Sequence, residues 1–281
     1  MKRIIVMVLA VLLYAGSSFA QDPFAALKQE LVEEGLDPAF IAGVYDEPSV
    51  QFTPRLILAN FTIKESKLNY GQFLKPKVVA RCKDYYQDNK ETLDKAYKEY
   101  GVSPEIIVAI LMVETRLGTY TGKFGIVNVL STFAAASDPE LMKTMYDQLP
   151  PEAKQEYSFD RFRKYCLRKS QWAYEELKAF LKYAYESGIS APDKVGSMSG
   201  ALGYPQFLPS NIERFGRDGN GDGAVDLFNH GDAQASIANY LRAHGWKEDL
   251  TVEQKRKVLF SYNRSMPYVN TLLALAAAMK E

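Results

Sequence analysis

The chain has 281 residues, of which 47% are hydrophobic and 24% are charged, a balance that is ordinary for a globular protein with a substantial core. Its 34 basic and 34 acidic residues give a formal net charge of zero. The apolar content excludes extensive disorder, and the absence of a basic excess or stripe argues against a nucleic-acid partner.

The N-terminus has the features of a secretory signal. Lys2 and Arg3 precede an apolar run over residues 4–15, and Ser-Phe-Ala at 18–20 places small side chains where a signal peptidase recognises them. The run is shorter than the roughly 20 residues that cross a bilayer as a helix, and no cysteine stands at the cleavage point to carry a lipid. We predict a signal peptide at 1–20 and export to the periplasm, with an uncleaved N-terminal anchor as the alternative.

Two cysteines, Cys82 and Cys166, lie in this exported chain, where a disulfide could persist. They do not form a CxxC pair of the kind that binds metals. The sequence leaves two readings open, a disulfide or two buried thiols.

After the signal, residues 21–281 are expected to form a single domain with a helical lead-in at 21–76. Amphipathic patterns at 24–34 and 36–44 predict two short helices. Residues 49–76 mix aromatic, polar and short apolar runs without a sustained period, and we predict an extended segment there that wraps a helical body.

The most apolar segment of the chain predicts a buried helix over 104–117. Ser103 can cap this helix, Pro104 suits its first position, and Glu105 opposes the dipole at its N-terminus. The helix is expected to end near Gly118.

Glu114 is the one carboxylate that this apolar run meets. At helical spacing it follows Ile107, Ile110 and Leu111 on one face, so it is expected on a buried element. Burial raises the pKa of a carboxyl group, which makes Glu114 a candidate general acid. The alternative is a structural glutamate that pairs with Arg116 or turns to water.

The remaining sequence is also mainly helical. Helical patterns are predicted at 76–100, 170–185, 232–245, 252–263 and 267–279, and a glycine-rich stretch at 196–223 interrupts them. Strand signals are weak throughout, so the fold class is expected to be mainly α.

The glycine-rich stretch begins with SMSGALGYPQFLPS at 197–210. Its small residues allow close backbone approach, while Ser197, Tyr204 and Gln206 offer hydrogen-bonding groups beside Phe207. Sugar sites combine polar groups for hydroxyls and amides with aromatic faces for the ring. A tight turn between helices is the alternative.

The next stretch, DGNGDGAVDLFN at 218–229, matches the calcium loop of an EF-hand. The side chains expected to bind calcium at loop positions 1, 3, 5 and 9 are Asp218, Asn220, Asp222 and Asp226. Position 12 departs from the pattern, because Asn229 replaces the bidentate Glu. Asp232 can supply the missing carboxylate, or it can instead cap the following helix. A metal-free Asp-Gly turn is the remaining alternative.

The order of these motifs is more specific than any one of them. VETRLG, SxSGALGYPQFLPS, the calcium-type loop, DAxxSIANYLRAHGW and YNRSxxY follow one another, and this series resembles the membrane-bound lytic transglycosylase B family, glycoside hydrolase family 103. The resemblance is sharp over about 101–135 and 170–281. It implies an α-rich, lysozyme-like fold with an inserted calcium loop, and cleavage of the β-1,4 bond between N-acetylmuramic acid and N-acetylglucosamine in peptidoglycan to 1,6-anhydromuramyl products.

The same resemblance implies roles for individual residues. The catalytic acid of the family's VET motif matches Glu114, which would act as acid and then as base. Residues implied to contact the sugar are Ser197, Gln206, Tyr240, Tyr262 and Asn263. Asp232 occupies the position of a late ligand in the family's calcium loop. The alternatives from other classes are a lysozyme-type muramidase and a non-catalytic peptidoglycan-binding protein.

Two departures from the family limit this transfer. A Pro-Arg-Arg run that commonly follows the catalytic Glu is replaced by Ser-Asp-Pro-Glu at 137–140, and the region 137–169 is longer than usual. Contacts that those arginines make with a stem peptide are therefore in doubt here.

Overall fold

The computed structural model describes residues 22–62 and 69–281. The predicted signal peptide at 1–20 lies outside the described residues, as does the segment 63–68. Within the described part of the chain, no helix is both long enough and apolar enough to cross a membrane.

The described residues are mainly helical, as predicted. The first helices are α1 (Ala25–Glu33), α2 (Pro38–Asp46), α3 (Pro54–Thr62), the 3-10 helix η1 (Tyr70–Leu74), α4 (Pro76–Asp88), α5 (Lys90–Tyr100) and α6 (Pro104–Thr115). There follow α7 (Ile126–Ala134), the 3-10 helix η2 (Ala135–Ser137), α8 (Pro139–Asp147), α9 (Pro151–Glu156), α10 (Phe159–Glu186), α11 (Pro209–Phe215), α12 (His230–Ala243), α13 (Val252–Tyr262) and α14 (Met266–Lys280).

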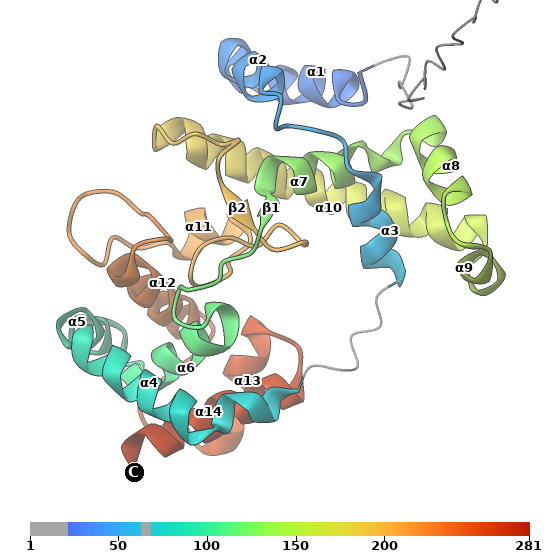
Figure 1. The fold of residues 1–281 in the computed structure, drawn as a ribbon. Coiled ribbons are helices and arrows are strands. Elements are labelled where there is room, and N and C mark those ends of the chain that lie inside the picture. The colour runs from blue at the N-terminus through green and yellow to red at the C-terminus, as the bar shows by residue number, and fades with distance from the viewer. Residues whose placement is uncertain (1–21, 63–68) are drawn as a thin grey trace, which may run out of the picture.

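These helices form two groups (Figure 1). One group contains α1–α3 and α7–α10, and the long helix α10 packs on α7, η2 and α8. The other contains α4–α6 and α12–α14, in which α14 packs on α6, η1 and α4. A two-stranded sheet and α11 lie between the groups.

Helix α6 lies at the centre of the second group. All of its residues are buried except Glu105, Val113 and Glu114, and it contacts α4, α5, α12 and α14. Pro104 and Glu105 occupy the first turn as predicted. The expected cap is wrong, however, because the side chain of Ser103 makes no capping hydrogen bond.

The C-terminal end of α6 is also earlier than predicted. The helix stops at Thr115, and the next three residues, Arg116, Leu117 and Gly118, have positive φ values of 53°, 62° and 81°. Left-handed backbone is strained for residues with a Cβ, so the chain leaves the helix in a turn that the surrounding structure must hold in place.

The segment 49–76, predicted as extended, is not helical over residues 49–53, but it is helical over most of the rest that the structure describes. Pro54 opens α3, whose Leu56 and Ile57 are buried, and Tyr70–Leu74 forms η1. Helix α3 packs on α7 and has only nine residues. Its apolar stripe is too short to give a clear period, and tertiary packing decides its conformation.

Two other helical predictions need correction. The pattern at 76–100 is two helices, because the chain breaks at Asn89 between α4 and α5. The glycine-rich stretch also contains one helix that was not predicted, α11, which starts at Pro209 and packs on α10 and α12.

The small sheet brings the glycine-rich loop to the chain that follows α6. Strand β1 (Phe124–Gly125) pairs antiparallel with β2 (Val195–Gly196). Two further bridges, from Gly196 to Leu202 and from Leu202 to Phe207, fold the loop after β2 back on itself. Strands of two residues are too short to show an alternating pattern, so the sequence does not predict them.

Both cysteines are buried free thiols, so the disulfide reading is wrong. Cys82 lies in α4 and Cys166 in α10, which belong to different helix groups. Burial raises the pKa of each thiol to about 12, which keeps both protonated and unreactive.

The backbone of Gly122 lies against the backbone at the start of the glycine-rich loop, and a substitution of this glycine tests that contact. Its φ is 105°, and a Cβ at this position would lie 2.0 Å from the carbonyl oxygen of Gly196. We expect Gly122→Ala to lower the free energy of unfolding by more than about 3 kcal/mol, because backbone strain adds to a clash with backbone. Denaturant unfolding followed by circular dichroism measures this.

Gly35→Ala is the matched control. Gly35 has a φ of 97°, and a Cβ added there would meet no atom within 4 Å, so only the strain of about 1–2 kcal/mol is expected. Equal losses in the two variants would contradict the claim that backbone contact at Gly122 fixes the loop.

Candidate active site

Glu114 and Tyr268 meet at the centre of the candidate site. The Tyr268 hydroxyl, on α14, donates a hydrogen bond of 2.7 Å to Glu114 Oε1, one residue before the end of α6. Tyr268 is 1% exposed, and α6 and α14 pack along each other. The carboxyl group is therefore held in one orientation, with Oε2 left without a hydrogen-bond partner among the described residues.

The surroundings of Glu114 favour its protonated form. Burial raises the pKa of its carboxyl group from 4.5 to about 7, and the hydrogen bond from Tyr268 opposes that rise in part. No second carboxylate of the described residues contributes to the shift. Pairing with Arg116 is not observed, because Arg116 is exposed and no ion pair joins the two within the described chain.

Burial also raises the pKa values of Tyr268 and Tyr262 well above 10, with the charge of Glu114 as a further cause. Both hydroxyl groups therefore stay protonated and act as hydrogen-bond donors throughout the neutral range. The influence of Glu114 on both tyrosines places them in one cluster.

The end of α6 is tied to the glycine-rich loop by the residue after Glu114. The Thr115 hydroxyl donates 3.0 Å to the backbone oxygen of Tyr204 and accepts 3.0 Å from the backbone N–H of Gly118. A Cβ on Gly118 would lie 2.9 Å from the Tyr204 ring, so glycine is needed there. The strained turn after the helix is thus held by Tyr204 from outside.

Ser197 and Gln206 lie at the two ends of this loop. Ser197 Oγ accepts the backbone N–H groups of Ser199 and Ala201 at 3.2 and 3.0 Å. Gln206 has a left-handed φ of 51°, and its Nε2 donates to the backbone oxygens of Thr121 and Gly203 at 3.2 and 2.9 Å. These bonds leave the Ser197 hydroxyl proton and Gln206 Oε1 free to meet a ligand.

Aromatic side chains form one wall of the site. The rings of Tyr240 and Tyr262 lie 5.0 Å apart, and each packs on Phe207, at 5.6 and 6.0 Å. Tyr262 donates to the backbone oxygen of Pro205 at 2.6 Å, and Tyr240 to that of Ser261 at 2.8 Å. These bonds fix both rings. Tyr262 is partly exposed, whereas Tyr240 is buried and stacks on His244 at 4.0 Å.

The remaining two predicted contacts, Tyr204 and Asn263, differ in setting. The Tyr204 ring is half-buried and packs 4.6 Å from the ring of His230, below the turn after α6. Asn263 is exposed and ends α13, where its backbone oxygen accepts from the N–H of Ser265 at 2.7 Å.

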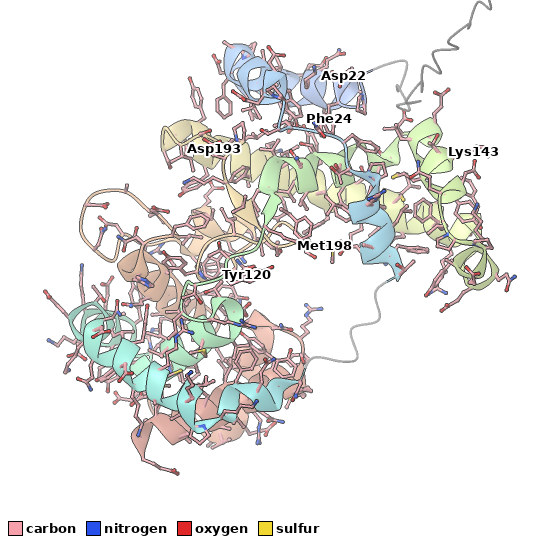
Figure 2. The ribbon with its side chains drawn as sticks, in the orientation of Figure 1. Asp22, Phe24, Tyr120, Lys143, Asp193 and Met198 are labelled. Atoms are coloured by element: carbon pink, nitrogen blue, oxygen red, sulfur yellow. The ribbon has the colours of Figure 1, made fainter. Side chains whose placement is uncertain are left out.

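Figure 2 shows how the two sides of the site come together. Met198, in the glycine-rich loop, lies near the lower end of α3, and Tyr120 marks the turn after α6. Asn60 on α3 confirms the first contact, because its Nδ2 donates 3.2 Å to the backbone oxygen of Met198. The glycine-rich loop thus contacts α3 at Met198 and α6 at Tyr204.

The predicted calcium loop is closed by its own hydrogen bonds. The Asp218 carboxylate accepts three backbone N–H groups, from Gly221, Asp222 and Gly223 at 2.5–3.2 Å, and these bonds lower its pKa. Asn220 Nδ2 donates to Asp222 Oδ2 at 2.8 Å. Asn220 and Asp222 are thus in direct side-chain contact, while the Asp218 carboxylate is bonded to the backbone of the same turn.

Asp226 and Asp232 do not join these three. Asp232 is fully buried and accepts the backbone N–H groups of Gly219, Asn220 and Asp226, so it braces the loop from within. It is not the helix cap either, since α12 begins at His230 and Asn229 caps it. Asp226 Oδ1 accepts from the N–H of Phe228.

The carboxylates of this loop are too few at one point to form a complete calcium site by themselves. Within the described residues no three His, Cys, Asp or Glu side chains lie close enough together to hold a metal ion. Any ion would rest on Asp218, Asn220 and Asp222, with carbonyl oxygens of the loop completing its shell.

Tyr268 is the functional residue that residue-by-residue reasoning missed. It is the final residue of YNRSMPY, at 262–268, which alone indicates only a turn with aromatic residues. The Ser265 cap and Pro267 start α14 so that Tyr268 lies in its first turn, pointing at α6. The sequence signal for Tyr268 was therefore a helix start, marked by Ser265 and Pro267, directly after an aromatic turn.

The mainly helical fold, with one desolvated carboxyl group beside a glycine-rich loop, is that of lysozyme-like transglycosylase proteins. The chain matches the Transglycosylase SLT domain family over residues 19–258, and it belongs to that family. This confirms the family resemblance of the motif series.

A sequence relative is the membrane-bound lytic murein transglycosylase B of Escherichia coli (strain K12). It is 31% identical over 175 residues, which are 62% of this chain and 40% of that protein. The match thus spans less than half of the relative's own length.

Solved structures share the fold over most of the chain. Soluble lytic transglycosylase SltB1 of Pseudomonas aeruginosa has a TM-score of 0.73 at 22% identity, covering 92% of this chain and 98% of that one. The Escherichia coli lytic transglycosylase SLT35, in complex with calcium, has a TM-score of 0.69 at 22% identity, over 90% and 92% of the two chains. SltB3 of Pseudomonas aeruginosa, in complex with NAG-NAM-pentapeptide, has 0.71 at 20%, over 91% and 78%.

The raised pKa of Glu114 predicts a pH-dependent stability. Between pH 4.5 and about 7 the carboxyl group is ionised in the unfolded chain but protonated in the fold, so unfolding releases a proton and stability falls as pH rises. We expect Glu114→Gln to remove this loss, and to be more stable than wild type above pH 7 by up to about 3 kcal/mol. Urea unfolding at pH 4 and pH 8 measures it.

Tyr268→Phe is the companion variant. It removes a donor that stabilises the carboxylate, so the Glu114 pKa should rise above its wild-type value in a carbon-13 carboxyl titration. A Glu114 pKa near 4.5 in the wild-type protein, or a fall in Tyr268→Phe, would contradict this account of the site.

Proposed function

We propose that this protein is a lytic murein transglycosylase, which cleaves the β-1,4 bond between N-acetylmuramic acid and N-acetylglucosamine in peptidoglycan. The observation that carries the proposal is Glu114, a single carboxyl group of pKa about 7 held by Tyr268 beside the glycine-rich loop. Family membership and the peptidoglycan fragment bound by its structural neighbour SltB3 support the substrate class.

In the first step, Glu114 acts as general acid. Since Tyr268 occupies Oε1, the proton is carried by Oε2 and passes to the glycosidic oxygen as the bond from C1 of muramic acid breaks. A group with a pKa of about 7 is partly protonated at neutral pH and gives up its proton readily, as such an acid must.

In the second step, the Glu114 carboxylate acts as base. It takes the proton of the muramyl C6 hydroxyl while that oxygen bonds to C1, which forms the 1,6-anhydro ring and restores the acid without net water. Most glycosidases use two carboxylates, but a nucleophile within the substrate gains from effective molarity and needs only one. No other carboxyl group of the described residues contributes to the pKa shift of Glu114, which supports a mechanism with one carboxyl group.

Sugar binding is proposed to use the groups that the fold leaves free. Ser197 can donate its hydroxyl proton, and Gln206 Oε1 can accept from an N-acetyl amide. The partly exposed ring of Tyr262 suits the apolar face of a sugar and is supported by Tyr240, with Tyr204 and Asn263 at the margins of the site. We also propose export to the periplasm, where the substrate lies, on the sequence of residues 1–20.

A structural calcium ion is proposed at Asp218, Asn220 and Asp222. All three carry side-chain oxygen atoms in one glycine-rich turn, and the structural neighbour SLT35 was solved in complex with calcium. The loop hydrogen-bonds to α12 through Asp232, so an ion there would stabilise the fold rather than take part in the reaction.

Glu114→Gln should lower product release from purified sacculi by about 10²–10⁴-fold, because an amide can neither give nor take the proton. Glycan binding in a pull-down should be unchanged. Mass spectrometry of the released muropeptides gives the readout, and Glu105→Gln, in the first turn of the same helix, is the control.

The products separate the competing functions. Anhydromuropeptides from wild type support the proposal, whereas reducing muramic acid ends, heavier by one water, indicate a lysozyme-type muramidase. Binding without release from wild type would indicate a non-catalytic peptidoglycan-binding protein.

Calcium at millimolar concentration should raise the melting temperature of wild type by about 3–10 °C, the range expected for a weak site. The double variant Asp218→Asn/Asp222→Asn should lose this shift, since it removes two charged donors. Asp193→Asn, at an exposed position outside the loop, should keep it. The calcium proposal is contradicted if neither calcium nor a chelator changes the melting temperature of protein that mass spectrometry shows to be metal-free.

A further inference from the structure

A basic pocket lies where the end of α3 meets the start of α10, outside the site of Glu114. It has a volume of about 500 Å³ and is lined by Phe61, Asp160, Arg161, Lys164, Tyr165 and Arg168. We name it the Arg161 pocket. Three cations and one carboxylate give its lining an excess of positive charge.

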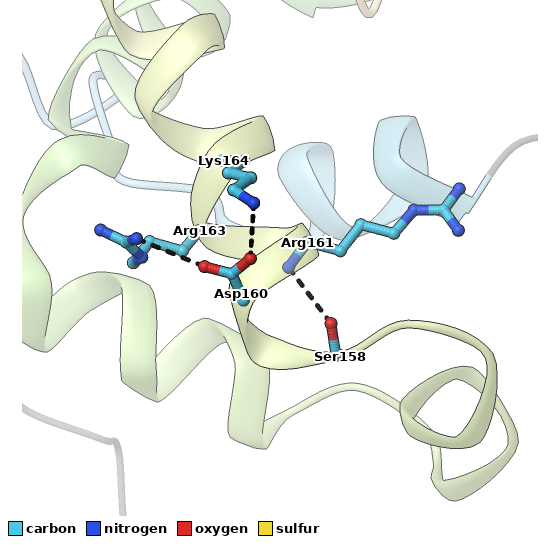
Figure 3. Close-up of polar contacts among 5 residues, drawn as sticks. All are labelled: Ser158, Asp160, Arg161, Arg163 and Lys164. Carbon is cyan, nitrogen blue, oxygen red and sulfur yellow. Dashed lines mark hydrogen bonds and ion pairs between the residues drawn. The ribbon is translucent and has the colours of Figure 1, made fainter.

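The single acid of the pocket is already engaged (Figure 3). Asp160 pairs with Lys164 at 2.8 Å and with Arg163 at 3.3 Å. Neither pair involves Arg161 or Arg168. Asp160 therefore neutralises neither of these two guanidinium groups.

The wall of the pocket is aromatic and firmly packed. Phe61 lies 4.7, 5.1 and 5.0 Å from the rings of Tyr157, Phe162 and Tyr165. The guanidinium of Arg161 lies 4.6 Å from the Tyr157 ring, in cation–π contact. The cation is thus partly ordered before any ligand arrives, which lowers the entropy lost on binding.

Helix α3 connects this pocket to the glycine-rich loop. Asn60 bonds the backbone oxygen of Met198 at 3.2 Å and the Ser199 hydroxyl at 3.4 Å, and the next residue, Phe61, forms the pocket wall. A glycan strand bound along the loop would therefore pass close to the Arg161 pocket.

We propose that the Arg161 pocket binds the carboxylates of the peptide carried by the bound glycan strand, an inference that rests on the proposed function. A peptide of five residues reaches about 17 Å when extended, and Asn60, which contacts the loop at Met198, directly precedes Phe61 of the pocket wall. Its C-terminal carboxylate is a planar acceptor that guanidinium groups bind in bidentate fashion. Apolar side chains of the peptide would pack on Phe61.

The test compares two substrates and two double variants. Arg161→Ala/Arg168→Ala removes the available cations, and Lys98→Ala/Lys257→Ala removes two exposed lysines of α5 and α13 as a charge-matched control. The substrates are glycan strands with intact peptides and the same strands after an amidase has removed the peptides. All variants are first compared with wild type by thermal melting.

We expect the arginine variant to lose about tenfold in kcat/KM on peptide-bearing strands, as for two partly exposed charge pairs. Its activity on peptide-free strands should equal that of wild type, and the control should be unchanged on both. Arg161→Lys/Arg168→Lys should recover part of the loss. Equal losses on both substrates, or no loss on either, would overturn the inference.

A binding measurement separates the source of the anion. A synthetic stem pentapeptide should bind wild type more tightly than its C-terminal amide, and the difference should vanish in the arginine variant. Wild-type binding to phosphatidylglycerol vesicles that depends on the two arginines, without peptide binding, would show a lipid surface instead and overturn the inference. If wild type releases fragments from neither strand, the proposed function itself fails, whatever the variants do.

Discussion

The arrangement of this protein depends on keeping one carboxyl group out of water. Glu114 stands on a helix that is buried along nearly its whole length, and desolvation raises its pKa to about 7. Tyr268 offsets part of that cost with one hydrogen bond, and it can do so only because α14 packs along α6. The raised pKa that makes Glu114 the proposed general acid is therefore a consequence of how the second helix group is packed.

The glycine-rich loop follows a strand that lies between the two helix groups, and three side-chain hydrogen bonds tie it to α6, to the chain after α6 and to α13. Thr115 bonds the oxygen of Tyr204, Gln206 bonds that of Thr121, and Tyr262 bonds that of Pro205. Each such bond contributes about 1 kcal/mol, so together they hold the loop against the strained turn after α6. Glu114 and the proposed sugar-binding groups of the loop are thus held in a fixed arrangement.

The sequence predicted the features that follow from local pattern. The apolar run of α6, the helices of the C-terminal third and the order of the motifs were sufficient for the fold class and for Glu114 as candidate acid. The extended reading of 49–76 failed because α3 owes its conformation to packing on α7. Asp232 accepts three backbone N–H groups of the loop, and this role has the same sequence pattern as a calcium ligand, so the sequence alone does not separate the two roles.

What sequence could not supply is the direction of each polar group. Gln206 and Ser197 were both expected to meet sugar, but only the structure tells which of their atoms are already used, and so which remain. The same holds for Glu114, where Tyr268 takes Oε1 and leaves Oε2. One carboxyl group can give and recover a proton at a single oxygen only if the other oxygen is held throughout, and a buried tyrosine that stays protonated holds it without competing for that proton.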